Sequence, residues 1–185
     1  MCAQTSVTIR RATLADVEAL EPLIAESVRV LQAADYTTEQ REGALGSVFG
    51  IDRQLIRDGT YFVVEINGRI VGCGGWSRRR TMFGSDHRSE REDALLDPAT
   101  DAARIRAFFV RPGYERRGIG SAIMQASEEA AAAEGFTRLE LRSTLTGMPL
   151  YRAHGFVESE KAEIPLPSGK TLPTVQMFKV LQRGR

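Results

Sequence analysis

Two glycines separated by a single residue, Gly118 and Gly120, directly follow a pair of arginines. Glycine has no Cβ atom, so its backbone can approach a ligand closely, and the first N–H groups of a helix have no partner within that helix. If a helix begins at this point, its free amides and its dipole favour an anion. Arg116 and Arg117 would add positive charge beside them. These residues therefore predict a site for a diphosphate group.

Two other interpretations of this glycine pair were compared with the diphosphate site. One is a tight turn whose arginines are only solvated. The other is a dinucleotide-binding fold, whose glycine loop belongs to the first strand–helix unit of a parallel sheet. Here residues 61–66 and 69–76 predict two strands joined by Asn67-Gly68, a dipeptide typical of a two-residue hairpin turn. An antiparallel hairpin before the loop disfavours the dinucleotide-binding fold.

A second candidate for chemistry is Tyr151, which lies in a short predicted helix over residues 149–154 and is followed by Gly155 and Phe156. A phenol has a usual pKa of about 10, so it is protonated at neutral pH and can donate its proton to a leaving group. An aromatic residue on an apolar helix face more often packs in the core. Tyr151 is therefore a candidate general acid, with core packing as its alternative role.

The elements expected around these residues alternate between strands and helices. Thr13 and Asp16 resemble a capping box, and the apolar residues after them have helical spacing as far as Leu31. Apolar residues at positions 45–56 predict a second helical stretch, interrupted near Gly50 and ended by Asp58 and Gly59. The other expected elements are strands over residues 6–10, 105–110, 138–143 and 174–180 and from residue 156, a helix over residues 119–134, and a long loop over residues 78–103. This order predicts a mixed α/β sheet.

The composition limits the class of protein. A chain of 185 residues has the usual length of one domain, so we expect a single domain over residues 1–185. The 25 Lys and Arg residues balance 24 Asp and Glu residues, and a net charge of +1 argues against nucleic acid or an anionic membrane as partner. Cys2 and Cys73 form no metal-binding motif, so no metal is expected. The sequence has no apolar run of the length of a signal peptide or a membrane span, which favours the cytoplasm.

Two motifs in this order resemble those of the GNAT superfamily of N-acetyltransferases. The phosphate loop of that family reads Gln or Arg, two free residues, Gly, one free residue, then Gly or Ala. Residues 115–120 match it at both glycines and depart from it at Glu115. Residues 150–156 resemble the second signature, an aromatic residue on a short helix followed by Gly-Phe. The resemblance covers nearly the whole chain and implies a mixed, mostly antiparallel central sheet with splayed central strands and flanking helices.

The resemblance also implies an enzyme and its mechanism. It implies that an acetyl group passes from acetyl-CoA to a primary amine of a small molecule or protein by direct attack, with Tyr151 as the general acid. The strand before the phosphate loop would bind the pantetheine arm, and the loop amides would bind the pyrophosphate. Thr144 stands where many members have asparagine, and its hydroxyl could contact the cofactor or cap the following turn. The residues implied in cofactor binding are Phe108, Phe109, Val110, Arg116, Arg117, Gly118, Ile119, Gly120, Ser121 and Thr144.

Three questions stay open at this point. No general base is named, because the strand before the loop contains Arg104 and Arg106 where some members of the family have a glutamate. The departures at Arg104, Glu115 and Thr144 support an alternative function, that of a non-catalytic acyl-CoA sensor. No motif identifies the acceptor amine. A homodimer is common in the family and is therefore one expected arrangement.

Overall fold

The computed structural model describes residues 7–89 and 91–181 of the chain. Cys2 and residue 6, where the first strand was expected to start, lie outside the described residues. Within the described part, seven strands form one sheet in the order β1-β2-β3-β4-β5-β7-β6. The strands are β1 (Val7–Arg11), β2 (Tyr61–Ile66), β3 (Arg69–Ser77), β4 (Ala103–Val110), β5 (Arg138–Thr144), β6 (Val157–Pro165) and β7 (Thr171–Val180). The helices are the 3₁₀ helix η1 (Leu14–Asp16), α1 (Val17–Leu31), α2 (Thr38–Ala44), α3 (Arg53–Arg57), α4 (Ile119–Ala133) and α5 (Met148–Ala153).

The sheet is mixed and mostly antiparallel, as expected. Only β4 and β5 pair in the parallel direction, and every other pair of neighbouring strands is antiparallel. β7 lies between β5 and β6 and begins at Thr171 rather than at residue 174, because its first residues already pair with the end of β6. The expected fold class is confirmed.

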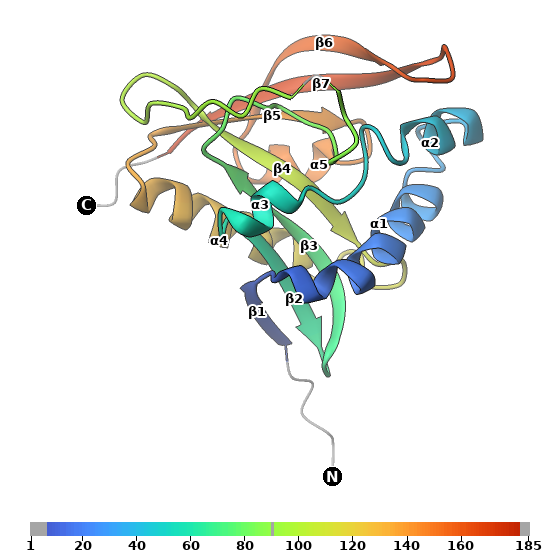
Figure 1. Ribbon diagram of the computed structural model, residues 1–185, viewed down its shortest axis with the longest axis horizontal. Helices are drawn as coiled ribbons and strands as arrows, with labels where there is room; N and C mark the ends of the chain where they lie inside the picture. Colours follow the sequence, from blue (N-terminus) through green and yellow to red (C-terminus); the bar gives the residue numbers. More distant parts are fainter. Residues whose placement is uncertain (1–6, 90, 182–185) are drawn as a thin grey trace.

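Helices cover both faces of the sheet, and a separate apolar core lies on each face. Successive residues of a strand point to opposite faces. Val63 of β2 therefore packs with Leu23 of α1 in one core, whereas Val64 packs with Ile123 of α4 in the other. In Figure 1, α1 and α3 lie in front of the sheet and α4 lies behind it. No helix in the described part of the chain is long and apolar enough to cross a membrane.

Two local predictions are confirmed. Asn67 and Gly68 have φ angles of 51° and 76°, the combination that a two-residue turn between antiparallel strands requires. At the start of the first helical segment, the Thr13 backbone N–H donates to Asp16 Oδ2 at 2.7 Å, so the capping box forms. It opens η1, and α1 continues directly from it. Both features depend on neighbouring residues only.

The expected second helical stretch is wrong between residues 45 and 49, whereas its interruption near Gly50 and its end at Asp58 are confirmed. α2 begins earlier than expected because Thr37 and Gln40 form a capping box, in which Gln40 N donates to Thr37 Oγ1 at 3.2 Å. The helix ends at Ala44, and Gly46 has a φ angle of +84°, outside the range of a right-handed helix. Residues 45–52 form turns before α3. Their apolar side chains pack from a folded loop and not from one face of a helix.

The segment over residues 78–102 contains no helix or strand among its described residues, as expected. It nevertheless has a definite fold. Arg80 N donates to the Ala94 carbonyl at 3.0 Å, and Leu96 N donates to the Arg78 carbonyl at 2.8 Å, so the two ends of the segment lie side by side. Arg106 of β4 donates hydrogen bonds to the carbonyls of Thr81 and Gly84, which hold this part of the segment beside β4.

Candidate active site

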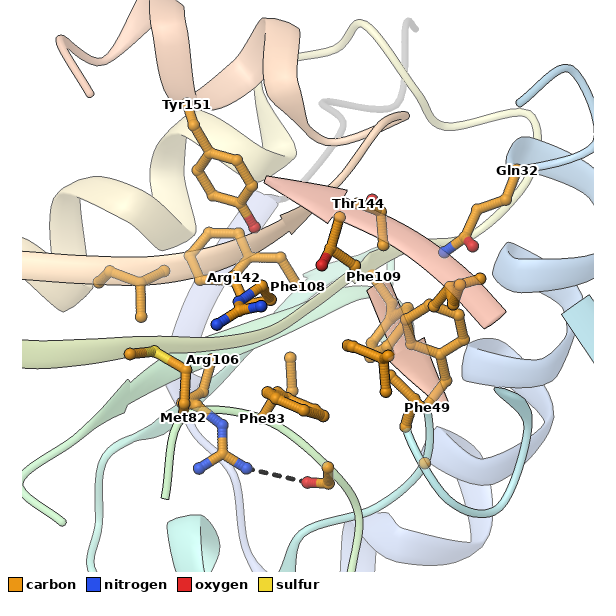
Figure 2. Close-up of a pocket in the computed structure, with 18 residues that line it drawn as sticks. Gln32, Phe49, Met82, Phe83, Arg106, Phe108, Phe109, Arg142, Thr144 and Tyr151 are labelled. Atoms are coloured by element: carbon orange, nitrogen blue, oxygen red, sulfur yellow. Dashed lines mark hydrogen bonds between the residues drawn. The ribbon is translucent and has the colours of Figure 1, made fainter. Parts of the chain in front are cut away.

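The central feature of the site is the divergence of β4 and β5. The two strands pair only at Ala103 with Leu139 and at Arg104 with Glu140. Beyond these pairs they separate, and a cavity of about 80 Å³ opens between residues 105–109 of β4 and the end of β5. Figure 2 shows this pocket with its lining side chains. The splayed central strands that the resemblance implied are therefore present.

The backbone of β4 leaves its regular course at the pocket. Ala107 has a φ angle of +55°, which costs an L-residue about 1–2 kcal/mol. The pairing with β3 shifts at the same place, so that Arg106 faces Gly75 while Phe109 faces Cys73. The Tyr61 hydroxyl, which reaches across the sheet, donates a hydrogen bond to the Ala107 carbonyl at 2.8 Å. This bulge turns backbone groups of β4 away from β3, and such bulges are common beside active sites.

Tyr151 reaches the pocket from α5. Its ring packs edge-on against Phe108 at 6.1 Å and against Phe156 at 5.9 Å, measured between ring centroids. These contacts hold the ring in place, and Figure 2 shows its hydroxyl directed into the pocket. Burial raises the pKa of the Tyr151 phenol above its usual value, because the phenolate would lose solvation. The side chain therefore both packs in the core and presents a protonated hydroxyl to the pocket.

The predicted helix start is found at Ile119, immediately after a loop with left-handed residues. Arg116 has a φ angle of +62° and Gly118 one of +80°. The first backbone hydrogen bond of α4 runs from Ala122 N to the Gly118 carbonyl at 2.9 Å. The amides of residues 119–121 precede this bond, so they have no partner inside the helix. A Cβ atom at Gly118 would meet no atom of the protein within 4 Å, so the loop is open on that side.

The charged side chains of this loop take two kinds of position: Glu115 folds back onto the loop, whereas Arg116 and Arg117 are exposed. Glu115, the departure from the family pattern, bends back so that its carboxylate accepts a hydrogen bond from Gly113 N at 2.6 Å. It therefore stabilises the loop from within. Arg116 and Arg117 are exposed, and the Arg117 guanidinium lies over the Tyr114 ring at 5.1 Å. Both arginines remain close to the open side of the loop as sources of positive charge.

The two sequence motifs meet in space. The Cδ2 atom of Leu150 in α5 lies 3.0 Å from the place where a Cβ atom of Gly120 would be, so a side chain at Gly120 would require Leu150 to shift. His154 at the end of α5 lies 3.0 Å from the Ser121 hydroxyl, measured from Nε2 to Oγ. The helix that carries Tyr151 therefore packs directly on the start of α4.

A known protein family matches the part of the chain that contains both the glycine loop and Tyr151. The sequence model described as the acetyltransferase (GNAT) family matches residues 25–156. The chain belongs to this family. Membership confirms the expected enzyme class, an acetyltransferase, with acetyl-CoA as its cosubstrate. No curated protein sequence matches this acetyltransferase significantly.

Solved structures of N-acetyltransferases share the fold of this GNAT protein. A GCN5-related N-acetyltransferase from Rhodopseudomonas palustris has a TM-score of 0.71 at 20% identity, over 98% of this chain and 99% of its own. PaiA N-acetyltransferase from Thermoplasma acidophilum, solved with coenzyme A, has a TM-score of 0.64 at 14% identity, over 95% and 99%. YncA from Salmonella typhimurium, solved with acetyl-CoA, has a TM-score of 0.64 at 16% identity, over 96% and 95%.

The other predicted site residues of this acetyltransferase divide between the pocket and its surroundings. Phe108 and Thr144 line the pocket with Tyr151. Thr144 Oγ1 accepts a hydrogen bond from Gly147 N at 3.1 Å, so its hydroxyl caps the following turn and keeps its own hydrogen available for donation. Phe109 also reaches the pocket, but its ring packs mainly against Phe49 at 6.0 Å.

The remaining predicted residues lie away from the pocket. Val110 pairs with Gly72 at the end of β4, and the Ile119 side chain is buried in the core around α4. Residues 116–121 are not part of the pocket lining. The acetyltransferase therefore has two separate parts, a glycine loop at the start of α4 and a pocket between β4 and β5.

A buried ion pair beside the pocket was not found by sequence reasoning. Arg106 is 3% exposed, and its guanidinium donates to Asp52 Oδ2 at 2.8 Å. It also donates to the carbonyls of Thr81 and Gly84, both at 2.9 Å, and so fixes the segment that contributes Met82 to the pocket. Arg106 thus fixes the position of this pocket wall. It lies in the part of the strand where some GNAT members have a glutamate.

No carboxylate or imidazole belongs to the described lining of the pocket. The two acidic residues closest to β4 in sequence or pairing are engaged elsewhere. Asp101 accepts a hydrogen bond from Asp97 N at 2.8 Å, and Glu140 forms an ion pair with Arg104. Among the described lining residues, the pocket therefore contains a phenol, a hydroxyl and guanidinium groups, but no carboxylate or imidazole that could act as a general base.

Arg142 is a second pocket residue that the sequence did not single out. It lies on β5, where buried and half-buried residues alternate, and its side chain enters the pocket. The alternation over residues 138–144 was visible in the sequence. It could not assign a role to Arg142, because the pocket on that face exists only where β5 separates from β4.

Proposed function

We propose that the protein transfers an acetyl group from acetyl-CoA to a primary amine by direct attack, with Tyr151 as the general acid. The observation that carries this proposal is the Tyr151 hydroxyl, held in protonated form and directed into the gap between β4 and β5. A phenol placed there can protonate a departing thiolate. The thioester of acetyl-CoA supplies the acyl carbonyl that the amine attacks.

The glycine loop fits the diphosphate part of acetyl-CoA. Three amides at residues 119–121 lie at the start of a fifteen-residue helix, where its dipole favours negative charge. The open side at Gly118 lets an anion approach the backbone. Arg116 and Arg117 add charge beside it. The backbone of Phe108, Phe109 and Val110 and the Thr144 hydroxyl would bind the pantetheine arm between the loop and the pocket.

Substitution at Gly118 tests this assignment. Gly118→Ala forces an L-residue to keep a φ angle of +80°, at a cost of about 1–2 kcal/mol. If the loop relaxes to avoid that cost, we expect CoA to bind about 5- to 30-fold more weakly in isothermal titration calorimetry. Gly113→Ala is the matched control, since Gly113 has a φ angle of +87° and also faces open space. Equal loss of CoA affinity in both variants would contradict the assignment.

The described pocket lining contains no carboxylate or imidazole that could take a proton from the amine. Burial among the apolar side chains of the pocket disfavours the ammonium form of the amine, because the charged form would lose solvation. We therefore propose that the acceptor reacts as the neutral amine, with its proton released to water. The backbone of the β4 bulge would polarise the carbonyl as negative charge develops on its oxygen.

This proposal predicts the pH dependence of the reaction. The value of kcat/KM should rise with pH and level off near the pKa of the acceptor amine. The pH at which it levels off should therefore change when amines of different pKa are compared. Because the pKa of Tyr151 is raised, the acid stays protonated, and no descending limb is expected below about pH 10. Initial rates across a pH series with two or more amines check this. A limb at one fixed pH for all amines would instead indicate a base on the enzyme.

The overall activity is tested by supplying acetyl-CoA with a broad panel of primary amines. Release of the CoA thiol is followed with a thiol-reactive dye, and mass spectrometry identifies the acetylated product. Acetylation of at least one amine is the expected result. CoA binding without turnover across the panel would favour the acyl-CoA sensor, and tighter binding of NAD or ATP than of CoA would favour a nucleotide-binding domain.

A further inference from the structure

The Arg142 guanidinium lies in the pocket, and part of its hydrogen-bonding capacity is unused within the described residues. Its Nη2 donates to Gln176 Oε1 at 3.0 Å, whereas its Nε is buried and has no hydrogen-bond partner among the described residues. Figure 2 shows the group near the middle of the pocket, on the side to which the Tyr151 hydroxyl points. A buried donor without a partner costs about 1–3 kcal/mol, so a ligand that accepts a hydrogen bond here would be favoured.

The charge of Arg142 is also unmatched within the described residues. Its hydrogen-bond partner among the described residues, Gln176, is neutral, and the Nε2 of that amide donates to Glu140 Oε2 at 3.1 Å. Glu140 in turn forms an ion pair with Arg104. The other cation of the pocket, Arg106, is already paired with Asp52. Arg142 is therefore the cation in the described pocket lining that has no carboxylate partner.

The position of Arg142 is fixed on two sides. Gln176 must turn its oxygen toward Arg142 because its nitrogen donates to Glu140. On another side, the Arg142 guanidinium lies 5.9 Å from the centroid of the Phe83 ring. An arginine held in this way loses little freedom when it binds an anion. Apolar side chains, among them Met82, Phe83 and Phe108, form much of the surrounding wall.

From this geometry we propose that the acceptor carries a carboxylate next to its primary amine, and that Arg142 binds that carboxylate. The acceptor is then a small amino acid with an apolar side chain. This inference rests on the proposed acetyl transfer. The planar guanidinium matches a carboxylate in size and in the direction of its N–H groups. A single unmatched positive charge fits a carboxylate, whereas a dianionic phosphate would leave a second charge uncompensated in an apolar pocket.

The test compares apolar amino acids with their primary amides at saturating acetyl-CoA. L-Leucine, L-methionine and L-phenylalanine are each paired with the corresponding amide. The amide removes the negative charge and also makes the amine less basic, so that more of it is neutral and reactive. A preference for the acid must therefore come from recognition. We expect kcat/KM to be about 10- to 100-fold higher for the acids. Equal or better use of the amides would overturn the proposal.

Substitution of Arg142 shows whether this residue is the source of the preference. In Arg142→Gln the ratio of kcat/KM between acid and amide should fall to about 1, while the KM for acetyl-CoA stays unchanged. Arg142→Lys should keep part of the preference, because the charge remains and the planar fork is lost. Arg138→Gln is the matched control, an exposed arginine on the same strand, and should leave the ratio unchanged. An unchanged ratio in Arg142→Gln would overturn the proposal.

A binding experiment separates failure of this inference from failure of the proposed function. N-acetyl-L-leucine and its amide are titrated into the CoA-loaded protein in a calorimeter. L-Leucine and its aminophosphonate analogue are titrated in the same way. The carboxylate should bind at least tenfold more tightly than the amide to the wild type and no more tightly to Arg142→Gln. Such selective binding without turnover of any amine would support the carboxylate site and contradict acetyl transfer. Tighter binding of the phosphonate than of leucine would overturn the choice of a carboxylate.

Discussion

Replacing Tyr151 by phenylalanine is expected to lower kcat about 10²- to 10⁴-fold, the usual contribution of one positioned acid or base. The binding of CoA should not change. The ring contacts with Phe108 and Phe156 do not involve the hydroxyl, and the Tyr151 hydroxyl has no hydrogen-bond partner among the described residues, so the packing of α5 should be kept. Steady-state kinetics, with the CoA dissociation constant measured in parallel, give the comparison.

The substitution Tyr151→Phe also separates catalysis from stability. Removing an unpartnered hydroxyl should leave the free energy of unfolding nearly unchanged, as measured by urea denaturation. Tyr151→Ala is a second variant, which should lower stability because it deletes the ring between Phe108 and Phe156. If Tyr151→Phe keeps the wild-type kcat, the general acid is another group, and the mechanism proposed above is wrong in that step.

Breaking the buried pair of Asp52 and Arg106 should have the largest effect on stability. Asp52→Asn leaves the Arg106 guanidinium uncompensated in the interior, and loss of one partner from a buried pair costs about 3–5 kcal/mol. Asp52 Oδ1 also accepts from Gln54 N and from Arg91, both at 3.1 Å, so the cap of α3 and the 78–102 segment are weakened together. Denaturant unfolding followed by circular dichroism measures the change.

Two companion variants strengthen this test. The exposed pair of Arg29 and Glu42 is the control, and Glu42→Gln should change the stability very little. In the double variant Asp52→Asn, Arg106→Met, neither charge remains buried, so part of the lost stability should return. A loss of less than about 1 kcal/mol in Asp52→Asn would show that the pair does not hold the pocket wall.

Features of the site that depend on neighbouring residues could be predicted from the sequence. The Asn67-Gly68 turn and the start of α4 after Gly118 are of this kind, because a few consecutive residues determine the backbone there. The family signatures at residues 115–120 and 150–156 implied that the glycine loop and Tyr151 belong to one site. They could not show that Glu115 stabilises its own loop, since that depends on how its side chain bends.

Features that depend on distant residues could not be predicted. Arg106 and Asp52 are 54 positions apart, and nothing in the local sequence of either residue indicates its partner. Arg142 resembles any polar residue of an alternating strand until β5 separates from β4 and opens a cavity on that side. The helix expected around residues 45–49 failed for a related reason, because apolar spacing alone does not distinguish a helix face from turns that pack on the sheet.

The packing of Leu150 and His154 on the first turn of α4 links the proposed proton donor, Tyr151, to the proposed binding site of the cofactor. Both belong to one rigid unit, so the donor keeps its place relative to the bound thioester whatever happens across the pocket. The opposite wall comes from other parts of the chain, including Met82 and Phe49. Substitutions in that wall can therefore change which amine is accepted without realigning the machinery that releases CoA. In the proposed mechanism, one half of the site holds the acetyl donor, and the other half can vary to suit the acceptor.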